Sequence, residues 1–232
     1  MAEQRQQPLI IQSKGGWLLM KEYYSKRAQE YEKIYHRDDP VRHAELAEIS
    51  RLMQELFFRL DVLEVACGTG YWTERIARSA RSVTAVDISE ETLRIARQKN
   101  IEGAEVRFIQ GDAYRSNEID GKFNAGCANF WFSHIPKSRI NEFLDQFHER
   151  LGRDSVVFFA DNNYVEGIGG KLIKKENDEN TYKVRGLSNG TVYEIIKNYY
   201  NEDELGNIFE PRSKGLKIHM GECFWWLRYR VS

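Results

Sequence analysis

The segment Glu64-Val65-Ala66-Cys67-Gly68-Thr69-Gly70 ends a short apolar run and precedes a helical pattern. A glycine-rich turn between a strand and a helix lets a ligand approach the backbone closely. Asp87 ends the next apolar run, 17 residues after Gly70. A carboxylate at that place can accept hydrogen bonds from both hydroxyls of a ribose. The turn and the carboxylate together predict a site for a ligand that contains a ribose.

The turn departs from the fingerprint of dinucleotide-binding proteins. Thr73 stands where Gly-x-Gly-x-x-Gly needs its third glycine, and the bulky Tyr71 and Trp72 precede it. Glu64 adds an anion, which repels phosphates but suits a ligand with an amino group or a sulfonium. Singly, the glycines can be a tight turn and Asp87 a helix-capping carboxylate. Their joint occurrence favours cofactor binding and opposes a nicotinamide-dependent oxidoreductase.

The elements around these residues alternate between short apolar runs and amphipathic helices. The apolar runs predict strands over 62–66, 82–88, 106–112, 123–132 and 155–161. This alternation is typical of an α/β fold, a parallel sheet with helices on both faces. Ser89 is the expected N-cap of the helix after the second strand. Two closing strands, within 216–231, have too short a link for a helical crossover and should pair antiparallel.

Less regular segments flank this core. Residues 1–16 are expected to be a loose tail, and 17–58 to be helical with a break at Pro40. Residues 162–200 hold a hairpin signal, Asn189-Gly190. A two-residue turn there would pair Arg185 with Glu194 and direct Arg185 and Lys197 to opposite faces. A bulge or a loop of odd length would bring the two cations to one face.

Five pieces of the chain, in order, resemble the class I S-adenosylmethionine-dependent methyltransferases: VLEVACGTG, VTAVDIS, FIQGDAY, CANFWFSHIP and VVFFAD. The resemblance implies a Rossmann-like, mostly parallel seven-stranded sheet with an antiparallel last strand. It also implies an N-terminal helical lid, a hairpin insertion, and S-adenosylmethionine as the cofactor, with S-adenosylhomocysteine as product. Ala66 departs from the pattern, because many members of the family have glycine there.

The same resemblance implies roles for residues at matching positions. Gly68 and Gly70 would line the methionine portion with Glu64 nearby, and Asp87 would hold the ribose. Ile88, Asp112 and Ala113 would surround the adenine, and Asn129 and Phe130 would border the methionine end. Trp72 is a candidate because aromatic faces attract a sulfonium. The full candidate cofactor set is Tyr24, Tyr31, Glu64, Ala66, Gly68, Gly70, Trp72, Asp87, Ile88, Asp112, Ala113, Asn129 and Phe130.

Three segments are similar to the subgroup that includes the phosphonate O-methyltransferase of the dehydrophos pathway: VLEVACGTGYWT, NFWFSHIP and YKVRGLSNGTVYEIIKNYY. The last carries Arg185, Gly190, Ile195-Ile196 and Lys197. This similarity implies a small anionic acceptor, such as a carboxylate, phosphonate or phosphate. An anionic oxygen is a competent nucleophile without a base and needs cations to hold it.

The catalytic candidates are therefore His134, Arg185 and Lys197, and the substrate-binding candidates are Tyr35, Trp131, His134, Arg185 and Lys197. His134 is either a general base or a residue that caps a helix or orients the loop. Arg185 can equally form a surface ion pair with Glu194. The aromatic candidates Tyr35 and Trp131 can equally be residues of the hydrophobic core. Alternatives to O-methylation are N-methylation of a small amine by a general base, and a non-catalytic protein that binds S-adenosylmethionine.

The length and composition of the chain limit the number of domains and the classes of partner. The chain has 232 residues, of which 41% are hydrophobic, and a net charge of −1. That length predicts a single domain. The resemblance implies that it is a methyltransferase domain, with a tail and lid in 1–58, a cofactor-binding core in 59–161, a substrate cover in 162–200 and a closing helix and hairpin in 201–232. The balanced charge disfavours a nucleic acid partner, and no apolar run is long enough to span a membrane.

Three cysteines, far apart, predict neither disulfides nor a metal site, and a reducing cytoplasm is the expected location. The expected partner is a small-molecule substrate, and the expected state a monomer or homodimer.

Overall fold

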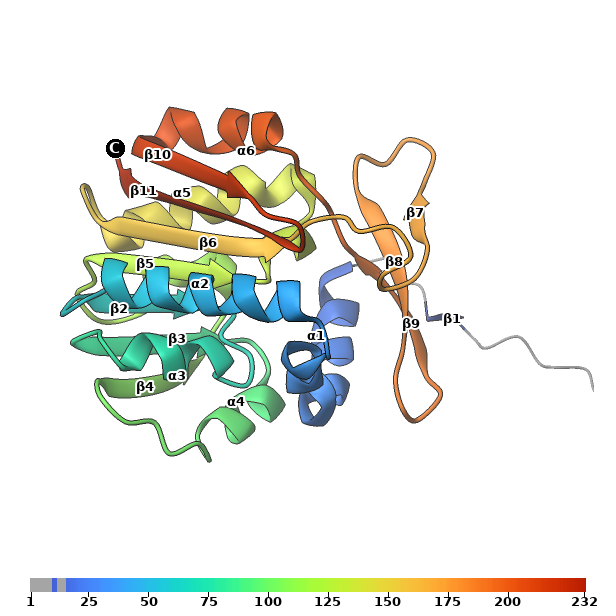
Figure 1. The fold of residues 1–232 in the computed structure, drawn as a ribbon, viewed down its shortest axis with the longest axis horizontal. Helices are drawn as coiled ribbons and strands as arrows, with labels where there is room; N and C mark the ends of the chain where they lie inside the picture. Colours follow the sequence, from blue (N-terminus) through green and yellow to red (C-terminus); the bar gives the residue numbers. More distant parts are fainter. Residues whose placement is uncertain (1–9, 12–15) are drawn as a thin grey trace, which may run out of the picture.

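The structure, a computed structural model, describes residues 10–11 and 16–232. Its main sheet has seven strands in the order β10-β11-β6-β5-β2-β3-β4 (Figure 1). The strands are β2 (Asp61–Val65), β3 (Ser82–Asp87), β4 (Glu105–Gln110), β5 (Ala125–Asn129), β6 (Val156–Asn162), β10 (Ser213–Met220) and β11 (Phe224–Val231). Strands β2 to β6 are parallel, and β11 runs antiparallel to both of its neighbours. The Rossmann-like sheet with an antiparallel last strand is confirmed.

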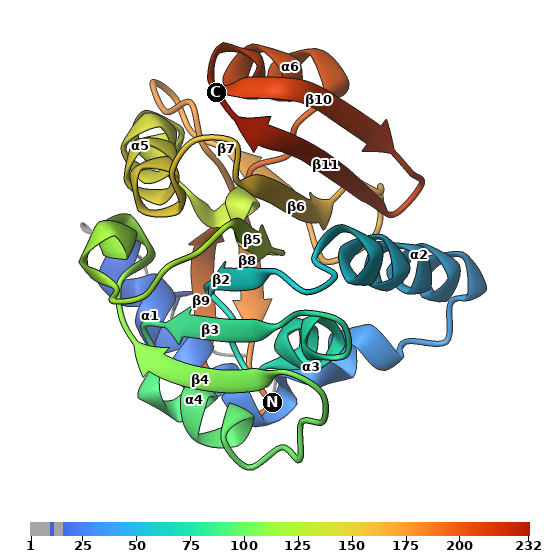
Figure 2. The same ribbon diagram turned by 90° about the vertical axis from the view of Figure 1, so that its left-hand side faces the viewer.

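Helices cover both faces of this sheet, as expected (Figure 2). Those of five residues or more are α1 (Gly16–Arg27), η1 (Ala28–His36), α2 (Pro40–Leu56), α3 (Tyr71–Ala77), α4 (Glu90–Ala96), η2 (Ala113–Glu118), α5 (Ile140–Leu151) and α6 (Glu202–Phe209). Short 3₁₀ turns are η3 (Phe132–His134), η4 (Lys137–Arg139) and η5 (Glu210–Arg212). One apolar core lies under α5 and α6, and a second lies under α2 and α3.

Local sequence explains where these elements begin. Val62, Leu63, Glu64 and Val65 of β2 are all buried, because a central parallel strand is covered on both faces. Ser89 caps α4 by accepting a hydrogen bond from the backbone N–H of Thr92, as predicted. The strand β2 and the cap of α4 therefore set where β2 and β3 end, and candidate residues lie at both of these ends.

A second, smaller sheet stands beside the carboxyl ends of the main sheet (Figure 1). It has the order β1-β9-β8-β7, with β1 (Ile10–Ile11), β7 (Leu172–Lys174), β8 (Thr181–Gly186) and β9 (Val192–Ile196). The expected loose tail is wrong at Ile10–Ile11, which pair with β9 in parallel. The rest of that tail, residues 1–9 and 12–15, lies outside the described residues.

Of the two hairpin loops that the sequence leaves open, the structure has the one of odd length. Leu187 donates its N–H to the Thr191 carbonyl, and Gly190 donates back to the Leu187 carbonyl, so three residues form the loop. Gly190 adopts φ +83°, the left-handed conformation that closes such loops. The register therefore moves by one residue. Arg185 lies opposite Tyr193 rather than Glu194.

This register decides which side chains share a face. Residues 183 and 185 of β8 lie on the same face as residues 193 and 195 of β9, because partners across the hairpin and every second residue point to one side. Lys197, two residues beyond Ile195, continues that row. Arg185 and Lys197 therefore converge, through the loop of odd length that the sequence left open.

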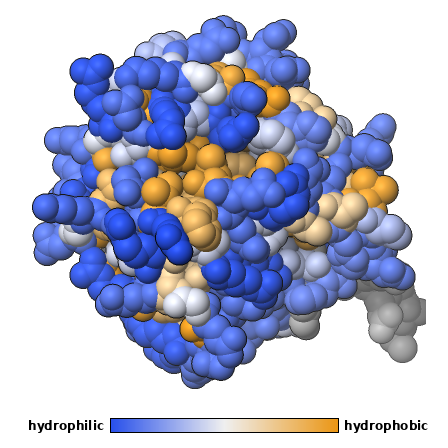
Figure 3. Space-filling view, turned by 60° about the vertical axis from the view of Figure 1, so that its left-hand side comes forward, coloured by the Kyte–Doolittle hydropathy of each residue, from blue (hydrophilic) through white to orange (hydrophobic). Residues whose placement is uncertain are grey.

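The opposite end of the sheet carries a groove at the amino ends of the strands. Leu52, Phe58, Leu60 and Val156 line it together with Arg228. Figure 3 turns this side toward the viewer and shows apolar side chains gathered among polar ones. No candidate catalytic or binding residue lies there. No helix among the described residues has the length and apolar character that a membrane span requires.

Candidate active site

A cavity opens at the carboxyl ends of the parallel strands, where α/β sheets bind ligands. It encloses about 760 Å³, a volume that includes open solvent at its mouth. Loops after β2, β3, β4 and β5 form its floor, and α1 and η1 cover it. Its lining is Tyr24, Tyr31, Ala66, Gly68, Asp87, Ile88, Thr92, Gly111, Ala113, Phe130, Trp131 and His134. We call it the cofactor cavity.

The loop after β2 is held in a conformation that glycine favours. Ala66 has φ +54° and Gly68 has φ +56°. The positive φ at Ala66 explains why glycine suits this position, since an L side chain there costs energy. A Cβ on Gly68 would lie 3.8 Å from the Tyr31 ring and occupy cavity space. The glycine therefore keeps the space between the loop and Tyr31 open.

Asp87 joins this loop to the next strand. Its Oδ2 accepts a hydrogen bond of 2.8 Å from the Gly68 N–H, and its Oδ1 accepts from the Ser89 N–H and the Thr92 hydroxyl. Burial raises the pKa of Asp87, against the effect of these donors. A buried carboxylate that lines a cavity gains from further hydroxyl donors, which a ribose supplies. The helix-capping role and ribose binding are therefore compatible in one residue.

Eight of the thirteen candidate cofactor residues line this cavity: Tyr24, Tyr31, Ala66, Gly68, Asp87, Ile88, Ala113 and Phe130. Tyr24 and Tyr31 come from α1 and η1, so both reach the cavity from the side that these two helices cover. This lining of a carboxylate, backbone amides and aromatic rings fits a ligand with a ribose and a sulfonium.

Two other candidates lie behind the cavity wall. Gly70 begins α3 with φ +77°, and a Cβ there would meet Ala96 and Phe108 rather than the cavity. Trp72 stacks on Phe130, with ring centroids 5.5 Å apart. Gly70 thus allows close packing of α3, and Trp72 supports the Phe130 ring from behind.

Glu64 is fully buried and accepts a hydrogen bond of 2.5 Å from the Thr73 hydroxyl. Burial, opposed by that hydrogen bond, raises the pKa of Glu64 to about 8. Asp112 caps η2, next to the lining residues Gly111 and Ala113. Asn129 is buried and its Oδ1 has no hydrogen-bond partner among the described residues. These three also lie outside the cavity lining.

A second cavity, which we call the acceptor cavity, adjoins the first. Tyr24, Tyr31, Phe130 and His134 line both, so these four side chains form a partition between them. The acceptor cavity encloses about 1570 Å³, including open solvent at its mouth. Its basic lining residues are Arg27, Arg37, Arg42, Arg185 and Lys197, and its one acidic lining residue among those described is Glu30. The cavity therefore favours anions.

His134 is held at both ring nitrogens. Nδ1 lies 2.7 Å from the Ile196 carbonyl oxygen, which can only accept, so Nδ1 carries the proton. Nε2 of the neutral ring then accepts a hydrogen bond of 2.7 Å from the Tyr24 hydroxyl. Burial and the nearby Lys197 charge lower the pKa of His134 to about 3. The ring is thus a neutral acceptor that orients Tyr24.

Lys197 and Arg185 enter the acceptor cavity from the hairpin. The buried Lys197 ammonium donates to Asp161 at 3.0 Å and to the Ser133 hydroxyl at 2.6 Å. It has three N–H donors, so one is left for a ligand. The Arg185 guanidinium donates to the Gly169 carbonyl oxygen and has no carboxylate partner among the described residues. The alternative interpretation of Arg185 as a surface ion pair with Glu194 does not hold, since Glu194 pairs with Lys175.

Two substrate candidates lie elsewhere. Tyr35 is buried and stacks on Tyr71 with ring centroids 3.7 Å apart, outside the lining of both cavities. Trp131 lines the cofactor cavity rather than the acceptor cavity, and its other face packs against Phe143. The core interpretation therefore holds for Tyr35.

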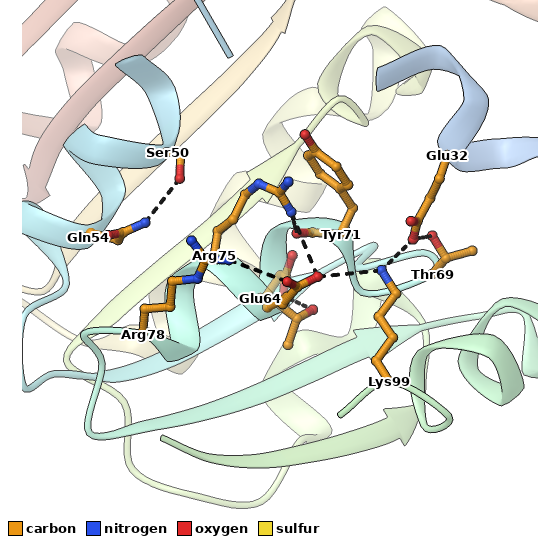
Figure 4. Close-up of polar contacts among 11 residues, drawn as sticks. Glu32, Ser50, Gln54, Glu64, Thr69, Tyr71, Arg75, Arg78 and Lys99 are labelled. Atoms are coloured by element: carbon orange, nitrogen blue, oxygen red, sulfur yellow. Dashed lines mark hydrogen bonds and ion pairs between the residues drawn. The ribbon is translucent and has the colours of Figure 1, made fainter. Parts of the chain in front are cut away.

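A polar contact joins the N-terminal segment to the loop after β2. Glu32 of η1 accepts a hydrogen bond from the Thr69 hydroxyl at 2.7 Å and pairs with the Lys99 ammonium at 2.5 Å (Figure 4). The three side chains come from separate segments and converge beside the cofactor cavity. This contact holds the cover down on the loop that carries Gly68.

Sequence reasoning missed several residues of the two cavities. Thr92 and Gly111 line the cofactor cavity, and Arg27, Arg37 and Arg42 line the acceptor cavity. Asp161 was expected only as the end of a strand. The available signal was its place at the carboxyl end of the fifth predicted strand. The arginines lie in helical segments whose packing the sequence does not reveal.

Comparisons with known proteins agree with this geometry. A methyltransferase domain family matches residues 62–154. A demethylmenaquinone methyltransferase from Staphylococcus aureus (strain MRSA252) is 24% identical over 179 residues, which cover 68% of this chain and 73% of the relative.

Two solved structures share the whole fold. The complex of DhpI with SAH is 25% identical, covers 95% of this chain and 99% of that chain, and has a TM-score of 0.74. The DhpI–SAM–HEP complex has the same identity and TM-score and covers 95% of this chain and 100% of that chain. The domain match, the relatives and the cofactor-bound neighbours together identify this chain as a class I S-adenosylmethionine-dependent methyltransferase.

Proposed function

We propose that the enzyme methylates an oxygen of a small anionic acceptor, a carboxylate, phosphonate or phosphate. The observation that carries this proposal is the lining of the acceptor cavity, in which five basic side chains face one acidic side chain. Cations hold an anionic oxygen without neutralising it, and an arginine can do so in bidentate fashion. The similarity to DhpI, which was solved as a complex with SAM and HEP, supports the binding of SAM together with a second small molecule.

The roles of the cofactor residues follow from their positions. Asp87 accepts hydrogen bonds from the ribose hydroxyls, while Ile88 and Ala113 pack on the adenine. Gly68 leaves room for the methionine portion, and Tyr31 and Phe130 place aromatic surface near the sulfonium.

The chemistry needs positioning more than proton transfer. The cofactor supplies a methyl group already activated by its sulfonium. The acceptor oxygen forms a bond to the methyl carbon while the carbon–sulfur bond breaks, and the electron pair stays on sulfur. Arg185 and the free N–H of Lys197 hold the acceptor so that one oxygen faces the partition. Tyr24, oriented by His134, borders the path between the cavities. Fixed geometry of this kind supplies most of the rate enhancement.

A general-base mechanism has less support from these side chains. A base works best when its pKa lies near the operating pH. The pKa of His134 is lowered to about 3, and its Nε2 is occupied by Tyr24. N-methylation of a protonated amine would also bring a cation into a cavity that is already positive. Transfer of the methyl group to an amine is therefore the outcome that the test below must exclude.

The test is methyl transfer with S-adenosylmethionine that carries a heavy methyl group. Pools of carboxylates, phosphonates, phosphates, phenols and amines are incubated with the enzyme, and products are read by mass. The expected product is a methyl ester. Label on nitrogen or on a phenol would contradict the proposal.

The variant Arg185→Gln should raise the KM for the acid at least tenfold, since it removes a charged hydrogen-bond donor. Its affinity for S-adenosylhomocysteine should not change, because Arg185 lies outside the cofactor cavity. Arg75→Gln, which removes an arginine outside both cavities, is the matched control. Unchanged acceptor kinetics in Arg185→Gln would remove Arg185 from the anion site.

A further inference from the structure

Arg42 is a buried arginine that forms no ion pair with a carboxylate among the described residues. It lies on the first turn of α2, and its side chain is only 8% exposed. Its backbone N–H is used by the Asp39 cap of the helix. Buried arginines are otherwise almost always paired, because an unpaired buried charge is costly. The position therefore calls for an anion that the described chain does not provide.

The guanidinium of Arg42 is supported by an aromatic ring. It lies over the ring of Phe224, 4.5 Å from the centroid. Its Nε is buried and has no hydrogen-bond partner, and its guanidinium forms no ion pair, among the described residues. A guanidinium that stacks on a ring keeps its edge free for a planar anion.

The free edge belongs to the acceptor cavity, of which Arg42 is a lining residue. Phe224 packs edge-on against Phe130, with centroids 5.1 Å apart, and Phe130 is part of the partition to the cofactor cavity. Arg42 thus stands one aromatic ring away from the partition. Arg185, in contrast, comes from β8 and is fixed by Gly169. The two arginines approach the cavity from different elements and have separate supports.

We propose that Arg42 binds a second acidic group of the acceptor, so that the preferred substrate is a diacid of which one group is methylated. This inference rests on the proposed function and deepens it. Arg185 and Lys197 hold the group that receives the methyl, and Arg42 holds the group that does not. Arg37, which also lines the cavity, adds to the positive potential at Arg42.

The experiment compares acids that share a chain length but differ in the second group. The probes are the linear dicarboxylates from malonate to adipate and the monocarboxylates from propionate to hexanoate, with phosphonoacetate and methylphosphonate as a second pair. Heavy-methyl transfer gives kcat and KM for wild type, Arg42→Gln, Arg42→Lys and the control Arg75→Gln. Titration of the same acids into the protein loaded with S-adenosylhomocysteine measures binding without turnover.

The wild-type enzyme should prefer a diacid to its matched monoacid by about 10- to 100-fold in kcat/KM, the worth of one charged hydrogen-bonding group. Arg42→Gln should remove that preference through KM, with the monoacid unaffected and kcat nearly unchanged. Arg42→Lys should recover part of it. Equal thermal stability and cofactor affinity across the variants would show that the fold is intact.

Each contrary result has a distinct meaning. If wild type methylates monoacids and diacids equally well, the second subsite does not exist, although O-methylation of acids stands. If Arg42→Gln weakens the binding of monoacids and diacids alike, Arg42 contacts the methylated group or supports the fold. The second subsite is then overturned, although O-methylation of acids stands. If no acid is either bound or methylated, both this inference and the proposed function are overturned.

Discussion

The surroundings of two buried carboxyl groups near the site shift their pKa values in opposite directions. Burial would raise the pKa of Asp161, but the Lys197 ammonium and His134 hold it at about 2. Glu64 has only the Thr73 hydroxyl beside it, and burial raises its pKa to about 8. Asp161 is therefore an anion that fixes a cation at the acceptor cavity. Glu64 is a protonated structural group at neutral pH that becomes an anion when a cation comes near.

Asp87 gives the sharpest prediction at the scale of a single residue. Asp87→Ala should weaken the binding of S-adenosylhomocysteine about 100-fold, because it removes two charge-assisted hydrogen bonds to the ribose. Isothermal titration measures this directly. Asp61→Ala is the control, since Asp61 pairs with Arg81 at the far end of β2. Unchanged affinity in Asp87→Ala would remove the ribose assignment.

His134 makes the protein sensitive to acid. Its pKa is 6.5 as a free side chain and about 3 in the fold, so the unfolded chain binds a proton that the folded chain does not. Stability should therefore fall as the pH drops from 6.5 to 3. His134→Gln should flatten this fall in denaturant titrations, whereas the exposed His43→Gln should not. If the stability of His134→Gln falls with decreasing pH as steeply as that of wild type, His134 is not buried in its neutral form.

Much of the cofactor cavity was predictable from the sequence at this scale. Ala66, Gly68, Asp87 and Ile88 sit at strand ends, and the topology of a parallel sheet brings strand ends to one edge. Glu64 lies on the same strand but is buried against Thr73, outside the cavity lining that includes Ala66. Spacing along the chain does not show that difference.

At the scale of elements, the hairpin β8–β9 decides which cations reach the acceptor. Three loop residues, closed by Gly190 in the left-handed conformation, put Arg185 and Lys197 on one face. The dipeptide Asn189-Gly190 predicted the hairpin but not its register, because the same dipeptide fits loops of two or three residues. The second sheet escaped prediction for a related reason. Its outer strands, β1 and β7, have two and three residues and too little pattern to detect.

The pair of Lys197 with Asp161 connects the two sheets, since β6 carries one residue and the other follows β9. Lys197→Met should destabilise the protein by about 3–5 kcal/mol, because it leaves a buried carboxylate without its cation. The double variant Asp161→Asn, Lys197→Met should recover most of that loss. Urea denaturation measures both. If Lys197→Met alone is as stable as wild type, the pair does not hold the hairpin in place.

At the scale of the whole molecule, we propose that the chain works as one domain with a two-part cover. Within 1–58, the described elements α1 and η1 close over the cofactor from one side. The segment 162–200 closes over the acceptor from the other side, and residues 59–161 and 201–232 form the base. Tyr24 and Tyr31 are walls of both cavities. Movement of the N-terminal segment would therefore open both cavities.

The contact of Glu32 with Thr69 and Lys99 should govern that movement. Glu32→Gln weakens it, and S-adenosylhomocysteine should then dissociate about threefold faster, as expected for a partly exposed ion pair. Stopped-flow displacement gives the rate. Glu55→Gln removes a comparable surface pair with Arg51 and should have no effect. An unchanged rate in Glu32→Gln would mean that the cover opens elsewhere.

The measurement that tests the central claim most directly is a competition between two acceptors on one carbon skeleton. An acid and the corresponding amine are mixed at equal concentration with the enzyme and heavy-methyl S-adenosylmethionine, and the products are separated by mass. A positive acceptor cavity without a general base predicts label in the methyl ester and none on nitrogen. Label on the amine, with the acid untouched, would contradict the anion-binding account of this methyltransferase.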